Sequence, residues 1–84
     1  MFFVYILKSL SSGRYYIGQT SNLDHRLNRH NENKVKSTKN QGPWKLCYHE
    51  QYQTRSEAMK REIHLKSLKS RKQIERLIDS VHNN

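Results

Sequence analysis

Cysteine and long apolar runs are almost absent from this chain. Cys47 is the single cysteine among 84 residues, and the apolar run Phe2–Leu7 ends at Lys8. One thiol cannot form an intramolecular disulfide, which argues against a disulfide-stabilised secreted domain and favours a reducing, cytoplasmic location. The apolar run is too short to cross a membrane and no basic segment precedes it, so we expect neither a signal peptide nor a membrane anchor.

Acidic residues are also scarce. Seven Asp and Glu stand against sixteen Lys and Arg, which gives a formal net charge of +9. A surface of this kind attracts polyanions and speeds their encounter. Solubility alone is an alternative explanation, but the charge favours a nucleic acid as the partner. An acidic membrane is disfavoured, because no stretch is both strongly apolar and strongly basic.

The length predicts one domain covering residues 1–84, with a small core. Three segments have the composition of strands, at 2–7, 15–18 and 44–52. The turn at 8–13 joins the first two into an antiparallel hairpin. If Leu7 pairs with Arg14 in that hairpin, Tyr5 lies opposite Tyr16. In the third strand, alternation places Trp44, Leu46 and Tyr48 on one side.

Three helices are predicted around these strands. The first runs from Asn22 to Glu32, the second begins at the capping box Thr54–Glu57, and the third begins at Ser70–Gln73 and packs on the sheet. The fold class is therefore α+β, with a small three-stranded antiparallel sheet flanked by about three helices. The polar stretch 31–43 is a long loop, and such loops are usually functional or mobile.

The segment 14–30 carries the strongest functional pattern. A short strand with Tyr16 ends at Gly18, where we expect the backbone to turn. The following helix places Arg26 and His30 one turn apart, at the border of its apolar face. A cation and an imidazole facing a strand with a phenol suit a phosphate group.

Glu62 is the second candidate. The predicted apolar face of its helix is marked by Ala58, Met59, Ile63 and Lys66, and Glu62 falls at its centre. A carboxylate facing a core is costly unless a charged group meets it. Two interpretations stay open: a salt bridge to a neighbouring Lys or Arg, or a metal ligand or catalytic acid.

Lysines in the loop 31–43 are candidates for contacts with a nucleic-acid backbone. Lys34, Lys36 and Lys39 lie in this stretch, which has almost no apolar residues. A solvated loop with incidental lysines explains them equally well.

Together these residues resemble the GIY-YIG nuclease domain over essentially the whole chain. Tyr16-Ile17-Gly18 keeps the second half of the family signature, whereas Phe3 stands at the glycine of the first half and is followed by Val4-Tyr5. Arg26, His30 and Glu62 follow in the order that makes the combination specific. The length is similar to that of small stand-alone bacterial members, which are related to the N-terminal nuclease domain of the excision-repair excinuclease.

The resemblance implies a metal-dependent endonuclease that hydrolyses phosphodiester bonds in DNA, in repair or in the processing of DNA structures. Tyr5 and Tyr16 would line the site, and one of the two phenols would help to activate the nucleophile. Arg26 would hold the scissile phosphate, and His30 would assist proton transfer or phosphate contact. Glu62 would bind one divalent cation, Mg²⁺ or Mn²⁺. Gln19 stands where the repair nucleases have a lysine, and it would contact the nucleic acid, as Lys34, Lys36 and Lys39 would.

Chemistry supports these roles without fixing the base. A tyrosine has a free pKa of about 10 and needs nearby positive charge, which Arg26 or a bound cation would supply. Histidine titrates closest to neutral pH, so His30 competes for the role of base. A nucleic-acid-binding module that does not cleave is the alternative function. DNA is favoured over RNA, a protein partner is compatible with the sequence, and the oligomeric state is open.

Overall fold

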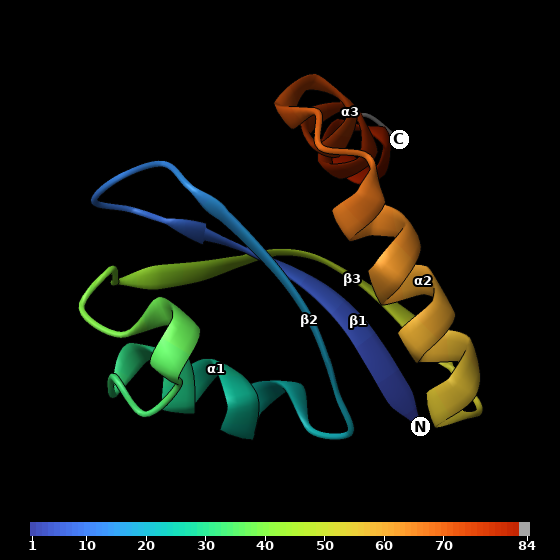
Figure 1. Ribbon diagram of the computed structural model, residues 1–84, viewed down its shortest axis with the longest axis horizontal. Helices are drawn as coiled ribbons and strands as arrows, with labels where there is room; N and C mark the ends of the chain where they lie inside the picture. The colour runs from blue at the N-terminus through green and yellow to red at the C-terminus, as the bar shows by residue number, and fades with distance from the viewer. Residues whose placement is uncertain (83–84) are drawn as a thin grey trace.

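A three-stranded sheet with helices on both faces forms the protein (Figure 1). This computed structural model describes residues 1–82. It confirms the predicted α+β class, with three α-helices and one short 3₁₀ helix among the described residues. The elements, in chain order, are β1 (Phe2–Ser9), β2 (Tyr15–Thr20), α1 (Leu23–Asn31), η1 (Lys36–Thr38), β3 (Trp44–Tyr52), α2 (Arg55–Ser67) and α3 (Arg71–His82).

β1 is the central strand, because the sheet order is β2-β1-β3 with both pairs antiparallel. Its segment Val4–Leu7 is buried. A strand that is covered on both faces needs apolar side chains in both directions, and this explains the continuous apolar run.

The register of the hairpin differs from the predicted one. Leu7 pairs with Tyr16 rather than Arg14, and Tyr5 lies opposite Gly18 rather than Tyr16. β1 continues to Ser9, and the chain turns tightly at Gly13, whose φ of 77° is in the left-handed region. The pairing therefore moves by two residues. An even shift preserves the side-chain direction, so Tyr5 and Tyr16 still share a face.

Gly18 does not end its strand, contrary to the prediction. β2 runs on to Thr20, and Gly18 is buried within it. The glycine is needed for another reason: a Cβ at this position would lie 2.5 Å from the Tyr5 hydroxyl oxygen and 2.7 Å from the ring carbon that bears it. The ring of Tyr5 thus lies over β2 at the place where that strand has no side chain.

An irregularity in β3 corrects the predicted alternation there. The pairing of β1 with β3 shifts between Ile6 and Leu7, so that Ile6 pairs with Tyr48 and Leu7 with Leu46. A bulge of this kind inserts one residue and reverses the direction of the side chains beyond it. Trp44 and Leu46 pack in the core under α1, whereas Tyr48 does not share their side.

The two faces of the sheet carry separate cores. α1 covers the face with Tyr5, Leu7 and Trp44, whereas α2 covers the face with Val4 and packs Ala58 against it (Figure 1). Asn31 ties the end of α1 to β3: its side-chain oxygen accepts from the Trp44 N–H at 2.7 Å.

The predicted helix starts are confirmed. Asn22 caps α1, and Thr54 and Glu57 form the capping box of α2. The predicted apolar face of α2 was wrong, because Met59 and Ile63 are exposed while Ala58 and Leu65 are buried. Ala58, Glu62 and Leu65 recur at helical spacing, so Glu62 still borders the buried face.

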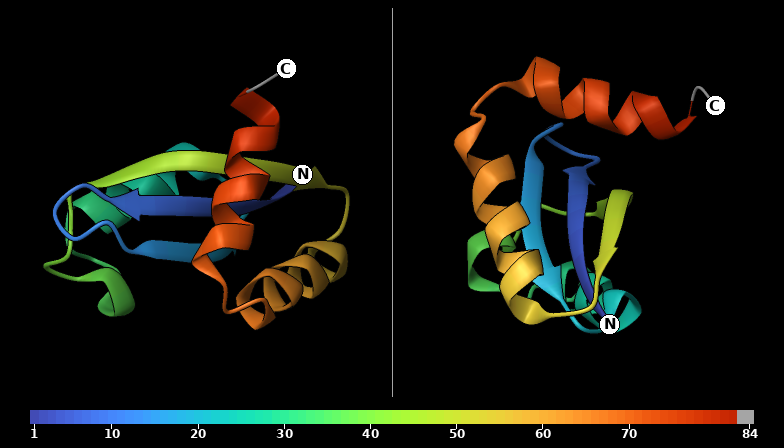
Figure 2. Two further views of the ribbon diagram at one scale, coloured as in Figure 1. Left: turned by 90° about the horizontal axis from the view of Figure 1, so that it is seen from above. Right: turned by 90° about the vertical axis from the view of Figure 1, so that its right-hand side faces the viewer.

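α3 runs across one end of the sheet instead of lying flat on it (Figure 2). Ile74, in its first turns, is buried, whereas Val81 is exposed. Its contacts with the sheet include Tyr15, whose ring lies under the Arg71 guanidinium. The prediction that this helix packs on the sheet therefore holds for its first half. Among the described residues, no helix has the length and apolar character needed to span a membrane.

Candidate active site

The hydroxyl group of Tyr5 is the centre of the candidate site. It lies 3.0 Å from His30 Nε2, and its oxygen accepts a hydrogen bond from Arg26 Nε at 3.4 Å. Arg26 and His30 come from successive turns of α1, so one helix delivers both groups to the central strand. His30 is fully buried and Tyr5 is 2% exposed.

One placement of protons satisfies every bond in this chain of contacts. The Thr38 hydroxyl donates its one proton to the Val35 carbonyl, so it accepts from His30 Nδ1–H. The Tyr5 hydroxyl therefore donates to His30 Nε2, while its oxygen accepts from Arg26 Nε–H. Nε2 is then an acceptor, and the proton of the neutral imidazole lies on Nδ1, 2.7 Å from the Thr38 hydroxyl oxygen. The Thr38 hydroxyl in turn donates to the Val35 carbonyl at 3.4 Å. This tautomer leaves His30 able to accept a proton from Tyr5.

Burial and neighbouring charges set the protonation states. Burial raises the pKa of Tyr5 to about 12; Tyr16 and Glu62 act in the same direction, and Arg26 opposes them. Burial and the Arg26 cation lower the pKa of His30 to about 4. At neutral pH Tyr5 is therefore a protonated phenol and His30 a neutral imidazole.

Tyr16 forms a wall of the same site. Its ring centroid is 4.9 Å from that of His30 and 6.3 Å from that of Tyr5. A hydrogen bond to Tyr5 is the main cause that raises the pKa of Arg26, and a further hydrogen bond to Tyr16 adds to it. The structure thus brings together the four residues predicted as catalytic: Tyr5, Tyr16, Arg26 and His30.

Glu62 lies on α2, which covers the other face of the sheet. Its side chain is 18% exposed and accepts a hydrogen bond from Lys66 Nζ at 2.9 Å. The salt bridge to a neighbouring lysine, one of the two interpretations left open for Glu62, is therefore present. The Glu62 charge is the weakest of the causes that raise the pKa of Tyr5, so the carboxylate lies within electrostatic range of that hydroxyl group. A salt bridge to an exposed lysine is weak and leaves the carboxylate open to a stronger cation.

Glu62 and Gln19 are the two oxygen donors on this side of the sheet that the metal prediction concerns. Gln19 Oε1 is buried without a hydrogen-bond partner among the described residues. Alternation along β2 places Gln19 on the side of Ile17, toward α2 and its Glu62. Mg²⁺ accepts a single carboxylate because it keeps several waters and takes substrate phosphate as a ligand. The part of the chain that the structure describes has no cluster of three or more His, Cys, Asp or Glu for a metal.

The predicted backbone-contacting lysines lie on or beside η1. Lys36 and Lys39 are exposed and flank Thr38, and Lys34 pairs with Glu32 at 3.7 Å. Because Thr38 is anchored on His30, the segment that carries Lys36 and Lys39 is held beside the site.

Thr38 is the functional candidate that the sequence did not reveal. It is buried, it accepts from His30 Nδ1, and its backbone carbonyl accepts from the Trp44 ring N–H at 3.3 Å. In the sequence it is one of several small polar residues in a loop without periodicity, so no local signal distinguishes it.

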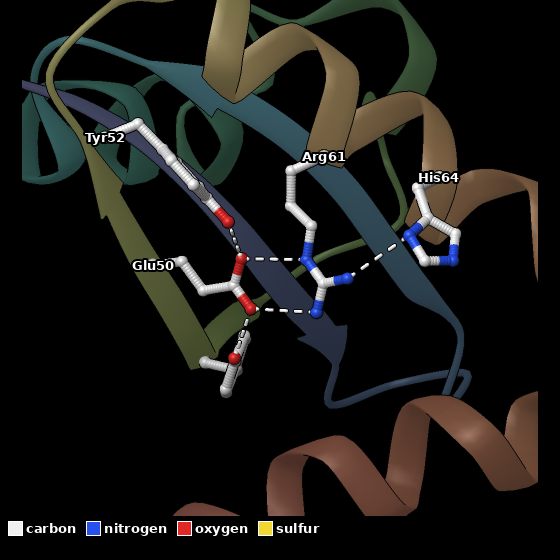
Figure 3. Close-up of polar contacts among 5 residues, drawn as sticks. Glu50, Tyr52, Arg61 and His64 are labelled. Carbon is white, nitrogen blue, oxygen red and sulfur yellow. Dashed lines mark hydrogen bonds and ion pairs between the residues drawn. The ribbon is translucent and has the colours of Figure 1, made fainter.

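A second polar cluster, the Glu50 cluster, lies on the α2 face (Figure 3). Glu50 accepts from Tyr52 at 2.6 Å, from Tyr48, and from two nitrogens of Arg61 at 2.9 and 3.0 Å. Burial acts to raise the pKa of Glu50, but the hydrogen bonds from Arg61, Tyr48 and Tyr52 outweigh it and lower the pKa. Arg61 also donates to His64 Nδ1 at 3.3 Å. The sequence pattern indicated no functional role for any of these residues.

Comparison with known proteins identifies the family of the chain. The chain is 42% identical over 73 residues to UPF0213 proteins of Staphylococcus aureus strains Mu3 and Mu50, which covers 86% of this chain and 88% of each relative. The solution NMR structure of a UPF0213 protein from Bacillus halodurans matches with a TM-score of 0.59 and 34% identity, over 94% of this chain and 84% of that one. The family model of the GIY-YIG catalytic domain matches residues 1–75. The chain therefore belongs to the GIY-YIG family, a nuclease superfamily.

Proposed function

We propose that this protein is a metal-dependent endonuclease that hydrolyses phosphodiester bonds in DNA, in the repair or processing of DNA structures. The observation that supports this proposal is the convergence of Arg26 and His30 on the buried Tyr5 hydroxyl. Binding alone would not need a protonated phenol aligned with an unprotonated imidazole nitrogen. General acid–base chemistry does need such a pair.

Proton transfer follows the hydrogen bonds of the site. As the oxygen of a water molecule attacks phosphorus, its proton passes to the Tyr5 oxygen and the Tyr5 proton passes to His30 Nε2. His30 becomes an imidazolium, with Nδ1–H held by Thr38. The bond from phosphorus to the leaving oxygen breaks, and a solvent proton neutralises that oxygen. Because the proton of the attacking water replaces the one given to His30, Tyr5 stays protonated at the end of the step.

The pKa values favour a concerted transfer. The pKa of Tyr5 is raised to about 12 and that of His30 is lowered to about 4, so a standing phenolate–imidazolium pair is disfavoured. In a concerted relay no net charge forms on Tyr5. The negative charge that develops on the phosphate offsets the positive charge formed on His30.

Arg26 and Glu62 divide the remaining work. Arg26, at the entrance to Tyr5, holds a phosphate oxygen and stabilises the charge of the transition state. Glu62 holds one Mg²⁺ or Mn²⁺, with Gln19 as a neighbouring oxygen donor. When bound, the cation supplies further positive charge to the phosphate and the leaving oxygen. Lys34, Lys36 and Lys39 contact the backbone next to the scissile phosphate.

Cleavage assays test this proposal. Purified protein is incubated with single-stranded, duplex and branched DNA and with RNA, in Mn²⁺, Mg²⁺ or EDTA. We expect cleavage with the cations and none with EDTA, and we expect Glu62→Gln to remove it while binding is retained. Asp79→Asn, at an exposed position of α3, is the matched control and should cleave normally. Cleavage that persists in EDTA or in Glu62→Gln would refute the role of the carboxylate.

One observation favours the non-cleaving alternative. Lys66 Nζ forms an ion pair with the Glu62 carboxylate at 2.9 Å, an arrangement that is also typical of a purely structural ion pair. A protein that binds DNA but cleaves none of the substrates with either cation would support this alternative.

A further inference from the structure

A groove of about 470 Å³ runs along the outer edge of the sheet, where β2 meets the end of α2 and the start of α3. We call it the β2–α3 groove. Figure 2 shows β2 as the strand next to α2, with α3 crossing above. Its volume is within the range of about 300–1,000 Å³ that is usual for ligand sites.

The lining of the groove is strongly basic. Four cationic side chains line it, Arg14, Lys66, Lys69 and Arg71, and the residues that line it include no Asp or Glu among those described. Between the cations, Ile17, Leu65 and Ile74 form an apolar floor. Cations around an apolar floor complement a chain of phosphates joined by sugars, because each part of that chain meets a matching surface.

Two of the cations are held in place. Arg71 lies over the Tyr15 ring, 4.8 Å from its centroid, and donates to the Gly13 carbonyl at 2.8 Å. Arg14 donates to the Gln41 side chain at 2.9 Å. Side chains that are ordered before binding lose less conformational entropy when a ligand arrives.

The groove borders the candidate active site through two of its lining residues. Tyr16 lines the groove, and its ring lies against His30. Lys66 lines it as well, and it pairs with Glu62. A strand whose scissile phosphate lies at Arg26 and Glu62 would therefore enter or leave through this groove.

We infer that the β2–α3 groove binds the sugar–phosphate backbone of the nucleic-acid strand on one side of the scissile bond. This inference rests on the proposed function, because it places the scissile phosphate at the Tyr5 hydroxyl. The contacts are made to phosphates, so binding here is independent of base sequence. The loop lysines Lys36 and Lys39 lie beside η1, and the groove supplies a separate contact along β2.

Binding measurements test the groove directly. Wild-type protein in EDTA is titrated into a labelled single-stranded DNA of about 12 nucleotides, within the ~4–16 nucleotides typical of single-strand sites. The test variant is Arg14→Glu/Lys69→Glu, at two exposed positions of the lining. The control is Lys45→Glu/Lys60→Glu, which makes the same change of charge at two exposed positions outside the groove. Circular dichroism and thermal melting check that both variants are folded.

We expect the test variant to raise Kd at least tenfold and the control to raise it less than threefold. The slope of log K against log salt should fall by about 1.4 for the test variant, since each phosphate contact to a single strand contributes about 0.7. An equal rise in Kd for both variants would overturn the inference, because it would show that binding depends on the net charge of the protein and not on the groove. An unchanged Kd in the test variant would overturn it as well.

The same variants separate this inference from the proposed function. If wild-type protein cleaves, the test variant should raise KM with kcat nearly unchanged, because contacts away from the reacting bond bind substrate and transition state equally. Cleavage with an unchanged KM would reject the groove and keep the nuclease. Specific loss of binding, in a protein that never cleaves, would keep the groove and reject the nuclease.

Discussion

Two polar clusters on opposite faces of one sheet use the same kinds of side chain for different ends. In the Tyr5 cluster, Arg26 meets a neutral phenol and a neutral imidazole. In the Glu50 cluster, Arg61 meets a carboxylate through two hydrogen bonds (Figure 3). The charge of Arg61 is balanced within the protein, whereas the Tyr5 cluster gives Arg26 no carboxylate among its hydrogen-bond partners.

The difference indicates which arginine is available to a substrate. An arginine that already has a bidentate carboxylate holds two elements together, here α2 and β3. An arginine beside neutral groups keeps its attraction for a phosphate. The two carboxylates of the α2 face show the same contrast, because Glu50 and Glu62 are 17% and 18% exposed but differ in their partners.

Replacing each of the two arginines separately by alanine should have the largest effects, on cleavage for Arg26 and on stability for Arg61. Arg26→Ala should lower the cleavage rate by about 10²–10³, the scale of one transition-state donor, and change stability little. Arg61→Ala should lower the free energy of unfolding by about 2 kcal/mol, less than the ~3–5 kcal/mol for a fully buried pair, because the pair is partly exposed. Single-turnover kinetics and urea denaturation measure both. The comparison fails if Arg61→Ala reduces the rate of the folded protein as much as Arg26→Ala does.

The two clusters should lose stability in different pH ranges. The pKa of His30 is lowered to about 4 from 6.5, so between these values the unfolded chain binds more protons and stability falls as pH falls. The full loss for one such group is about 3 kcal/mol. The pKa of Glu50 is lowered from 4.5, so its contribution is lost only below that pH. Urea denaturation at pH 7, 5.5 and 4.5 should show the first loss, and His30→Gln should abolish it; an unchanged pH dependence in that variant would contradict the assignment.

Gly18→Ala tests whether the Tyr5 cluster depends on the missing side chain of β2. The added Cβ would lie 2.5 Å from the Tyr5 hydroxyl oxygen, so the ring must move away from His30 and Arg26. We expect a loss of about 1–3 kcal/mol in stability, the usual cost of overpacking, together with a loss of cleavage. In a Tyr5→Ala background the same change should cost much less. Equal costs in both backgrounds would show that the contact does not limit the site.

Thr38 gives the smallest and most specific effect. Thr38→Val keeps the shape but leaves the His30 Nδ1–H without its acceptor, so we expect the ring proton to move to Nε2 and cleavage to fall about tenfold, the effect of one buried hydrogen bond. Thr38→Ser should restore both. Nitrogen NMR shifts of the imidazole report the tautomer independently of activity. A wild-type ring that is protonated on Nε2 would refute the proton relay.

Local signals were sufficient for most of the fold. Capping residues such as Thr54 and Glu57 and the apolar run of β1 are read within a few residues, and the structure confirms them. Tyr5, Arg26 and His30 were placed together because helical spacing and the family resemblance agree. The assumed pairing of Leu7 with Arg14 does not occur, because the length of a turn depends on how far the two strands continue.

Features that depend on the third dimension could not be predicted. The bulge in β3 turns the Tyr48 side chain to the opposite face of the sheet, and the alternation of residues in that segment does not predict it. Thr38 and Glu50 acquire their importance only from partners on other elements, His30 and Arg61, which lie 8 and 11 residues away in the chain. Met59 and Ile63 were assigned to the core because hydrophobicity alone does not tell which face of a short helix meets the sheet.

The absence of a side chain at Gly18 links the two halves of the signature in this chain, Phe3-Val4-Tyr5 and Tyr16-Ile17-Gly18. Tyr5 and Gly18 pair across two neighbouring strands, and the Tyr5 ring fills the space that a side chain at Gly18 would need. The size of one residue therefore limits the size of the other. Phe3 pairs with Thr20 and its ring packs edge-on against His49, so this position accommodates a bulky residue. The two tripeptides that name the family are therefore a single interlocking unit, whose tolerance to substitution follows from where one ring rests.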